Sequence, residues 1–310
     1  MGIFTALRTG IKKTNRSFGM IGILYLINGL FAVVLALAVQ SVLASRLGSS
    51  LALNEMLSDF DFQVFDDFLQ YHGGDISALF RQILWLFSAY MLVNTFTVGG
   101  VLARLRETES PFSLRSFFAG CGEYFGRFLR LLCLILPVVI VVSIIWGGIL
   151  SVVFSSLSSG ASSEVPVFYF ALMMILLFLL PIMLLAILSD YAKIAIVLHS
   201  ERSVLKSFRK SFLFILRNFF STMILQIFLL LLALLFFAVY VLLDLAVGMS
   251  DGMTIIVMAG MQQLFILSKM WNRSVAYGAQ LSLYENRTLP DFAIESIELT
   301  PPLAGGQRLN

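Results

Sequence analysis

The residues of this sequence with the clearest chemical potential are polar side chains inside or next to long apolar runs. A charge or amide in hydrocarbon is unfavourable, so it usually has a partner or a function. The set comprises Asn28, Asn94, Asp190, Lys193, Gln226, Gln262, Gln263, Lys269, Asn272 and Arg273. Two interpretations stay open: the amides join helices through hydrogen bonds of roughly 0.6–2 kcal/mol each, or the set lines a path for a substrate or protons.

Within this set, the sequence predicts one ion pair between distant segments. Asp190 directly follows the fourth apolar run, and Lys269 and Arg273 lie near the end of the sixth run. If the two places lie at similar depth, opposite charges there would pair.

Signatures of enzyme chemistry are scarce. His72 and His199 are the only histidines, and the topology predicted from charge puts them on opposite sides of a membrane, so they cannot share one metal or one catalytic triad. There is no H-E-x-x-H or P-loop motif, and Cys121 and Cys133 form neither a C-x-x-C pair nor a disulfide framework. We therefore predict no enzyme, metal or cofactor. A lipid enzyme that uses Asp190, Glu201 or Glu107 as acid or base remains an alternative.

The composition explains where these residues must reside. Hydrophobic residues make up 59% of the 310 residues and charged residues 13%, far from the balance of a soluble domain. Six apolar runs, each long enough for a helix of about 20 residues to cross hydrocarbon, cover 19–43, 79–103, 129–154, 166–189, 219–247 and 253–279. The sequence predicts an all-α polytopic membrane protein. The first run exceeds the length of a signal h-region, so we expect it to be an anchor.

Charge sets the predicted orientation. Of the 21 Lys and Arg residues, all except Arg46, Arg81, Lys269 and Arg273 lie in four segments. These segments are Arg8 to Arg16, Arg104 to Arg130, Lys193 to Arg217, and Arg287 with Arg308. The positive-inside rule makes them cytoplasmic, which requires an even number of spans. We expect a multi-pass protein of a bacterial inner membrane with both termini in the cytoplasm.

A pattern of basic amphipathic stretch, span, outer loop and returning span occurs three times. The basic stretches 6–18, 116–128 and 207–219 align by Arg16, Arg127 and Arg217, and a Phe follows each arginine within two residues. The predicted repeats are about 1–110, 111–200 and 201–287, which form one membrane domain (1–287) followed by a cytoplasmic tail (288–310).

The ends of the returning spans support the same pattern. When the sequences of these ends are aligned, Glu107, Glu201 and Glu285 fall at the same position. The same alignment pairs Asn94 with Asn272 and Gly100 with Gly278. We expect each carboxylate to engage a cation or backbone donor near the next segment, because it would otherwise face the negative end of a helix dipole.

The basic stretches are typical of helices that lie in the headgroup plane of a membrane. Predicted contacts with anionic headgroups come from Lys12, Lys13, Arg115, Lys206, Arg209 and Lys210. The alternative is that the stretches extend the spans into the cytoplasm.

The first outer loop (45–78) differs from the others, because Met56, Phe60, Val64 and Phe68 predict an acidic amphipathic helix. This helix either seals the outer face or acts as a gate or docking surface.

The segment from Ser189 to Tyr240, with SDYAKIAIVLHSERSVLKSFRKSFLFILRNF before a long apolar run, resembles a pattern of uncharacterised bacterial multi-span proteins. It is also similar to the membrane domain attached to some glycerophosphodiester phosphodiesterases. This resemblance implies an architecture and no activity, because the soluble phosphodiesterase barrel is absent from this sequence.

The leading functional hypothesis is a non-enzymatic membrane component: a scaffold, an accessory subunit or a lipid-interacting module. Its partners would be a bilayer with anionic headgroups and a possible membrane protein, and nucleic acid is not expected. The alternative is a small-solute or lipid-like transporter with a path between the repeats.

The charge distribution yields a topology test. Cysteines introduced by Arg115→Cys and Arg209→Cys should react with a membrane-impermeant thiol reagent only from the cytoplasmic side, whereas Asp66→Cys should react from outside. Labelling of Asp66→Cys and Arg209→Cys from the same side would contradict the predicted orientation.

Overall fold

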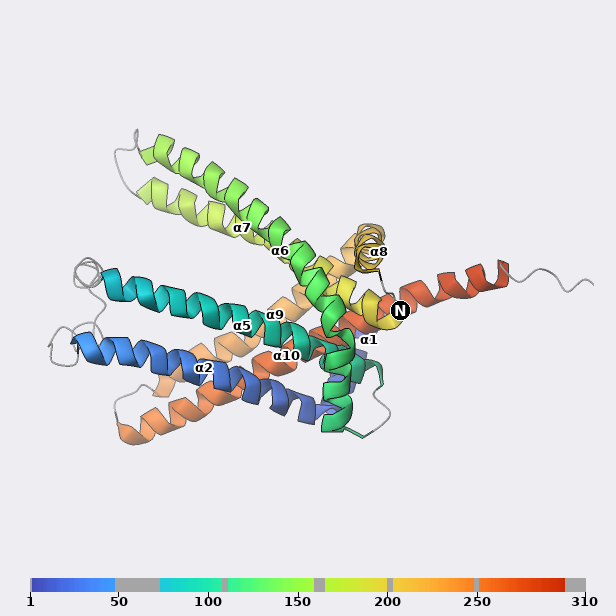
Figure 1. The fold of residues 1–310 in the computed structure, drawn as a ribbon, viewed down its shortest axis with the longest axis horizontal. Helices are drawn as coiled ribbons and strands as arrows, with labels where there is room; N and C mark the ends of the chain where they lie inside the picture. The colour runs from blue at the N-terminus through green and yellow to red at the C-terminus, as the bar shows by residue number, and fades with distance from the viewer. Residues whose placement is uncertain are drawn as a thin grey trace, which may run out of the picture.

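The described part of the chain, in a computed structural model, is helical throughout and covers residues 2–47, 73–107, 111–158, 165–199, 203–247 and 251–298. It contains eight α-helices and no strand within those ranges (Figure 1). Their bounds are α1 Ile3–Arg16, α2 Phe18–Leu47, α5 Gly73–Arg106, α6 Leu114–Ser158, α7 Val165–His199, α8 Val204–Arg217, α9 Phe219–Val247 and α10 Gly252–Glu298. The predicted outer-loop helix around 56–68 lies outside the described residues.

Six helices are long and apolar enough to cross a membrane: α2, α5, α6, α7, α9 and α10. The shortest apolar segment, Phe18–Ser41, has 24 residues, or about 36 Å at 1.5 Å per residue, which exceeds a hydrocarbon core of about 30 Å. The predicted all-α class is confirmed for the described residues, and each of the six predicted runs lies on a helix that is long and apolar enough to span a membrane. Several helices extend beyond the predicted runs: α5 begins at Gly73, α6 begins at Leu114, α7 ends at His199, and α10 continues through 288–298 of the predicted tail.

A polar residue separates each of two basic helices from the span that follows. Ser17 ends α1 and Asn218 ends α8, and each leaves helical geometry (φ −115° and −119°). Arginines from later helices bind both junctions: Arg104 Nε donates to Ser17 Oγ at 3.0 Å, and Arg287 donates to the Asn218 side chain. These two stretches are therefore separate helices, as predicted.

The second basic stretch, 116–128, does not form a separate helix. It is the first part of α6, which is continuous from Leu114 to Ser158. The residue after Arg127 is Phe128, which is fully buried and offers no polar group to accept an arginine or to cap a helix end. In Figure 1 the start of α6 runs across the ends of neighbouring spans before the helix curves away with α7.

The basic helices approach returning spans at glycines. α1 packs on α10, the start of α6 packs on α5, and α8 packs on α7. A Cβ at Gly10 would lie 2.6 Å from the Ala279 backbone nitrogen, and one at Gly100 would lie 2.7 Å from the Phe117 carbonyl oxygen. The first two pairs of helices thus touch backbone to backbone, which only glycine permits.

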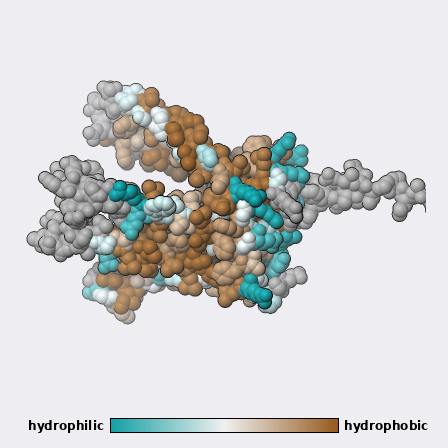
Figure 2. All heavy atoms as spheres, viewed as in Figure 1, coloured by the Kyte–Doolittle hydropathy of each residue, from teal (hydrophilic) through white to brown (hydrophobic). Residues whose placement is uncertain are grey.

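The hydrophobic core lies at one end of the molecule, which we call the basic end. It is the end that carries α1, α8, the start of α6 and the last turns of α10. Buried residues such as Leu102, Phe117, Tyr191 and Tyr284 form the main cluster. At the opposite end the α6–α7 hairpin diverges from the other spans, and Figure 2 shows apolar surface along it. Such surface is suited to lipid contact.

The glycine contact between α1 and α10 predicts a destabilising substitution. Gly10→Ala should lower the free energy of unfolding in detergent by about 1–3 kcal/mol, the usual range for overpacking, because the nearest atoms belong to the α10 backbone. Gly22→Ala is the matched control, since a Cβ there meets nothing within 4 Å. Thermal unfolding of the two variants measures the difference. A melting temperature for Gly10→Ala equal to that of Gly22→Ala would rule out a tight α1–α10 contact.

Candidate functional site

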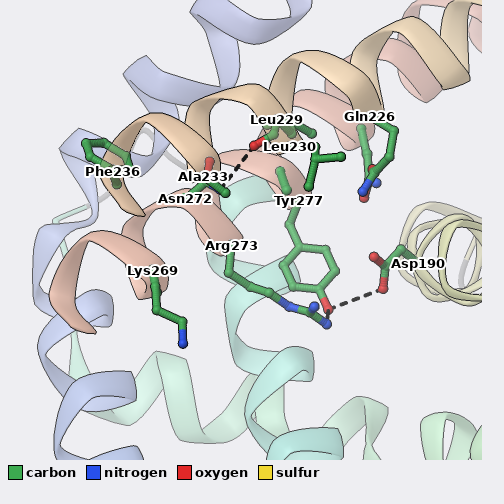
Figure 3. Close-up of a pocket in the computed structure, with 12 residues that line it drawn as sticks. Asp190, Gln226, Leu229, Leu230, Ala233, Phe236, Lys269, Asn272, Arg273 and Tyr277 are labelled. Atoms are coloured by element: carbon green, nitrogen blue, oxygen red, sulfur yellow. Dashed lines mark hydrogen bonds between the residues drawn. The ribbon is translucent and has the colours of Figure 1, made fainter. Parts of the chain in front are cut away.

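Two polar cavities flank one face of α10. The first has a volume of about 260 Å³ and lies between α7, α9 and α10 (Figure 3). The second has a volume of about 220 Å³ and lies between α2, α5 and α10. Lys269, Arg273 and Tyr277 line both cavities. Because the three residues are four positions apart, they form one stripe along the helix.

The stripe lies in the part of the sixth span that is nearest the basic end. Lys269 and Arg273 come 17 and 21 positions after Gly252, where α10 starts, or about 25 and 32 Å along the helix. Both side chains are exposed and line the cavities. Tyr277 was not among the residues singled out from sequence, although its spacing from Arg273 could have indicated it.

Asp190 connects α7 to this stripe. Its carboxylate accepts a hydrogen bond from Lys193 Nζ at 3.3 Å, which is also an ion pair, and one from the Tyr277 hydroxyl at 3.4 Å. Arg273 Nη2 in turn donates to the Tyr277 oxygen at 2.9 Å, as Figure 3 shows. The predicted direct ion pair of Asp190 with Lys269 or Arg273 is therefore wrong. Tyr277 stands between the charges, and Lys193, one turn along α7, is the partner of Asp190.

The site holds more positive than negative charge. Three cations, Lys193, Lys269 and Arg273, accompany a single carboxylate, Asp190. Within the described ranges, no carboxylate lies within 4.0 Å of the Lys269 or Arg273 side-chain nitrogens. Both cations lie beside aromatic rings: Lys269 Nζ is 5.7 Å from the Phe265 ring centroid, and the Arg273 guanidinium carbon is 5.2 Å from that of Tyr277. A cation–π contact of about 0.5–2 kcal/mol does not replace a counter-ion.

The second cavity contains a hydrogen-bonded group that joins three spans. Tyr90 of α5 donates its hydroxyl to Asn28 Oδ1 at 2.9 Å. The Asn28 amide donates to the Leu24 carbonyl oxygen at 2.7 Å and to Met270 Sδ at 3.5 Å. Asn28 thus fits the interpretation in which amides hold helices together. Asn94 also lines this cavity, and its side chain is exposed there.

The remaining predicted amides divide between the first cavity and positions outside both cavities. Gln226 and Asn272 line the first cavity, and the Asn272 amide donates to the Leu229 carbonyl oxygen at 3.3 Å. Gln263 accepts the Tyr25 hydroxyl at 2.7 Å, outside both cavities, and Gln262 is exposed. The cavity also contains Gln280, which the sequence reasoning missed because it lies beyond the predicted end of the sixth span.

The three aligned glutamates have different surroundings. Glu285 of α10 forms an ion pair with Lys13 of α1 at 3.6 Å, rather than with the nearby Arg287. Around Glu107, the Arg104 guanidinium donates to the backbone carbonyl at 3.0 Å. Glu201 lies outside the described residues.

The residues predicted to contact headgroups lie at the basic end. Lys12, Arg115, Lys206 and Arg209 are exposed, whereas Lys13 and Lys210 are half-buried. All six belong to α1, α8 or the start of α6.

Metal and cysteine chemistry have little support in this part of the chain. The described ranges contain no group of three or more His, Cys, Asp or Glu residues placed to hold a metal ion. Cys121 is buried and Cys133 is exposed, and both are free thiols.

The fold defines a multi-pass helical membrane protein with a cation-rich polar site beside its sixth span. No protein-family model, curated protein or solved structure matches this chain. The resemblance to the membrane domain of glycerophosphodiester phosphodiesterases therefore stays a prediction.

The Asp190–Lys193 pair yields a double-mutant test. Asp190→Asn should destabilise the protein by about 1–3 kcal/mol, because it leaves the partly buried Lys193 without its counter-ion. Removing both charges, with Asp190→Asn and Lys193→Gln together, should recover part of this loss. Thermal unfolding of the single and double variants gives the coupling free energy between Asp190 and Lys193. Additive losses would mean that the pair contributes nothing as a pair.

Proposed function

We propose that this chain is a non-enzymatic, lipid-interacting component of a bacterial inner membrane, with both termini in the cytoplasm. In this proposal α1, α8 and the start of α6 lie against the cytoplasmic headgroup layer and bind anionic lipid. The six spans anchor them. A stable membrane-protein partner is compatible with this role, as a scaffold or accessory subunit would require.

The observation that carries the proposal is the arrangement of α8 and α1. α8 buries Ser207, Ser211 and Phe214 against the bundle and exposes Phe212 and Leu216 together with Arg209. α1 similarly buries Ala6, Gly10 and Thr14. Apolar side chains exposed beside cations are unfavourable in water but suit the boundary between headgroups and acyl chains.

The magnitude of the attraction is consistent with docking. A Lys or Arg near an anionic membrane surface contributes about 1 kcal/mol. The cations Lys206, Arg209 and Lys210 of α8 would together contribute about 3 kcal/mol, screened by salt over about 8 Å at physiological ionic strength. Burial of Phe212 and Leu216 in acyl chains adds to this, at about 1.5–3 kcal/mol for each fully buried side chain.

The three-repeat organisation, which we also propose, draws support from two equivalent contacts. In the superposition of returning spans, Gly100 corresponds to Gly278. In the superposition of basic stretches, Cys121 corresponds to Gly10. A Cβ at Gly100 would lie 2.5 Å from Cys121 Sγ, and one at Gly278 would lie 3.0 Å from Gly10 Cα. Two alignments made separately thus predict the same partners.

The order of the contacts also fits a repeat. Each basic helical segment packs on the returning span that precedes it in the chain, and α1 packs on α10, the last one. This closes a ring of three units. Gly10 and Cys121 meet the returning spans α10 and α5, and the aligned residue of α8, Ser211, is likewise small and buried.

A second candidate function is transport of a small solute or a lipid-like molecule. The observation that favours it is the pair of polar cavities on either side of the Lys269–Arg273–Tyr277 stripe. Proton- or sodium-dependent uptake by reconstituted vesicles would support this alternative, whereas co-purification of a stable partner would support the subunit role.

Headgroup docking is tested with an environment-sensitive dye on α8. After replacement of the native cysteines, Phe212→Cys is labelled with a nitrobenzoxadiazole dye in liposomes containing phosphatidylglycerol. The emission should be blue-shifted relative to free dye in water, because position 212 faces the headgroup boundary. Replacing Lys206, Arg209 and Lys210 by Glu should reverse much of this shift.

Liposomes of pure phosphatidylcholine provide the matched control, in which the charge reversal should have a smaller effect. A water-like emission in both membranes, with the protein folded, would mean that α8 does not lie in the headgroup layer. That result would overturn the proposed function.

A further inference from the structure

We propose that the first cavity is a binding site for the acidic headgroup of a membrane amphiphile, with a phosphate or carboxylate oxyanion held between Lys269 and Arg273. This site is separate from the headgroup docking by α1 and α8. It lies at the depth of the spans, and it would hold a single ligand.

The charge of the cavity selects an anion. Lys269 and Arg273 have no described carboxylate within salt-bridge distance, while Asp190 is already engaged by Lys193 and Tyr277. An arginine that lies in a span without a counter-ion is costly. An oxyanion between the two cations would remove this cost, and Arg273 can present its remaining N–H groups to two oxygens of one phosphate or carboxylate.

The hydrogen-bonding groups of the cavity add a second requirement. Asn272 Oδ1 and Gln280 Oε1 are buried, and neither accepts a hydrogen bond from the described residues. Both residues line this cavity, and Gln280 is only 3% exposed. Buried acceptors without donors are unfavourable. A ligand with hydroxyl groups near its acid group would supply donors to them, as a glycerol phosphate does.

The shape of the cavity indicates a ligand that is polar at one end and apolar at the other. Leu229, Leu230, Ala233 and Phe236 of α9 form the apolar part of the lining. Leu230 is 49% exposed and lies 11 positions after Phe219, where α9 starts, or about 17 Å into the span. The cavity therefore reaches the lipid-facing surface at hydrocarbon depth.

The volume limits how much of the ligand enters. At about 260 Å³, the cavity is smaller than pockets for drug-sized molecules, which start at about 300 Å³. A headgroup fits, whereas two acyl chains do not. The chains would pass Leu230 and remain in the surrounding lipid.

The experiment measures binding of dihexanoyl phosphatidylglycerol to the purified full chain in a neutral detergent, by isothermal titration calorimetry. Dihexanoyl phosphatidylcholine tests the need for net negative charge, and glycerol phosphate tests whether a free anion suffices. The expected order of affinity is phosphatidylglycerol first, with phosphatidylcholine and glycerol phosphate each at least about tenfold weaker.

Four variants locate the site. Lys269→Gln should weaken binding of phosphatidylglycerol at least about tenfold, which is the effect of losing one charge-assisted hydrogen bond of about 1.4 kcal/mol. Arg273→Gln should have a similar effect. Leu230→Trp, at the apolar rim, should weaken lipid binding while leaving glycerol phosphate binding unchanged. Arg81→Gln is the matched control, because it removes an exposed cation of α5 that lines neither cavity.

Folding of each variant is checked by gel filtration and thermal unfolding. Lys269 takes part in no hydrogen bond or ion pair with the residues that the structure describes, so Lys269→Gln should fold even if Arg273→Gln does not. Equal affinity of folded wild type and Lys269→Gln, or equal affinity for phosphatidylglycerol and phosphatidylcholine, would overturn the proposal.

Binding of glycerol phosphate as tight as that of the lipid, together with lipid binding that is unchanged by Leu230→Trp, would assign the cavity to a soluble anion and overturn the membrane-amphiphile assignment. The dye on α8 reports headgroup docking independently. Failure of the cavity site in these titrations would therefore leave the proposed function intact, and failure of docking would leave the cavity site intact.

Discussion

The close backbone contact between basic helices and returning spans is the constraint on which the rest of the structure depends. Gly10 against Ala279 and Gly100 against Phe117 bring helix axes together where no side chain intervenes. In hydrocarbon, apolar side chains gain little by leaving lipid, so close packing of small residues is a principal source of helix association. The core consequently forms at the basic end, where these contacts lie, and the α6–α7 hairpin is left free to diverge at the opposite end.

The position of the polar site follows from that packing. α10 is held by α1 around Val275 and Ala279, and Lys269 and Arg273 precede this contact by between about half a turn and three turns. At that level the neighbouring spans have begun to separate, so cavities open on both sides of α10. The cations are thus held at the boundary between the packed and diverging halves of the bundle, where a polar ligand has room and the surrounding lipid is within reach.

Small differences in sequence decide whether a basic stretch becomes its own helix. Ser17 and Asn218 each accept a hydrogen bond from an arginine of a later helix, and the Asn218 amide also donates to the Phe214 carbonyl oxygen at the end of α8. Phe128 at the corresponding place cannot do this, and α6 remains unbroken. A helix break leaves backbone donors and acceptors without partners inside the helix, and a polar residue at the junction helps to satisfy them.

The sequence by itself determined the helical class, the six spans and the set of polar residues from which the site is built. These follow from hydropathy and length, because hydrocarbon offers a backbone few choices besides the helix. Only the tertiary structure decided which polar residues meet. It placed Tyr277 between Asp190 and Arg273 where a direct ion pair was expected, and it turned Asn28 toward Tyr90. Such pairings depend on the relative rotation and depth of distant helices, which packing at Gly10 and Gly100 fixes and which hydropathy along one chain does not encode.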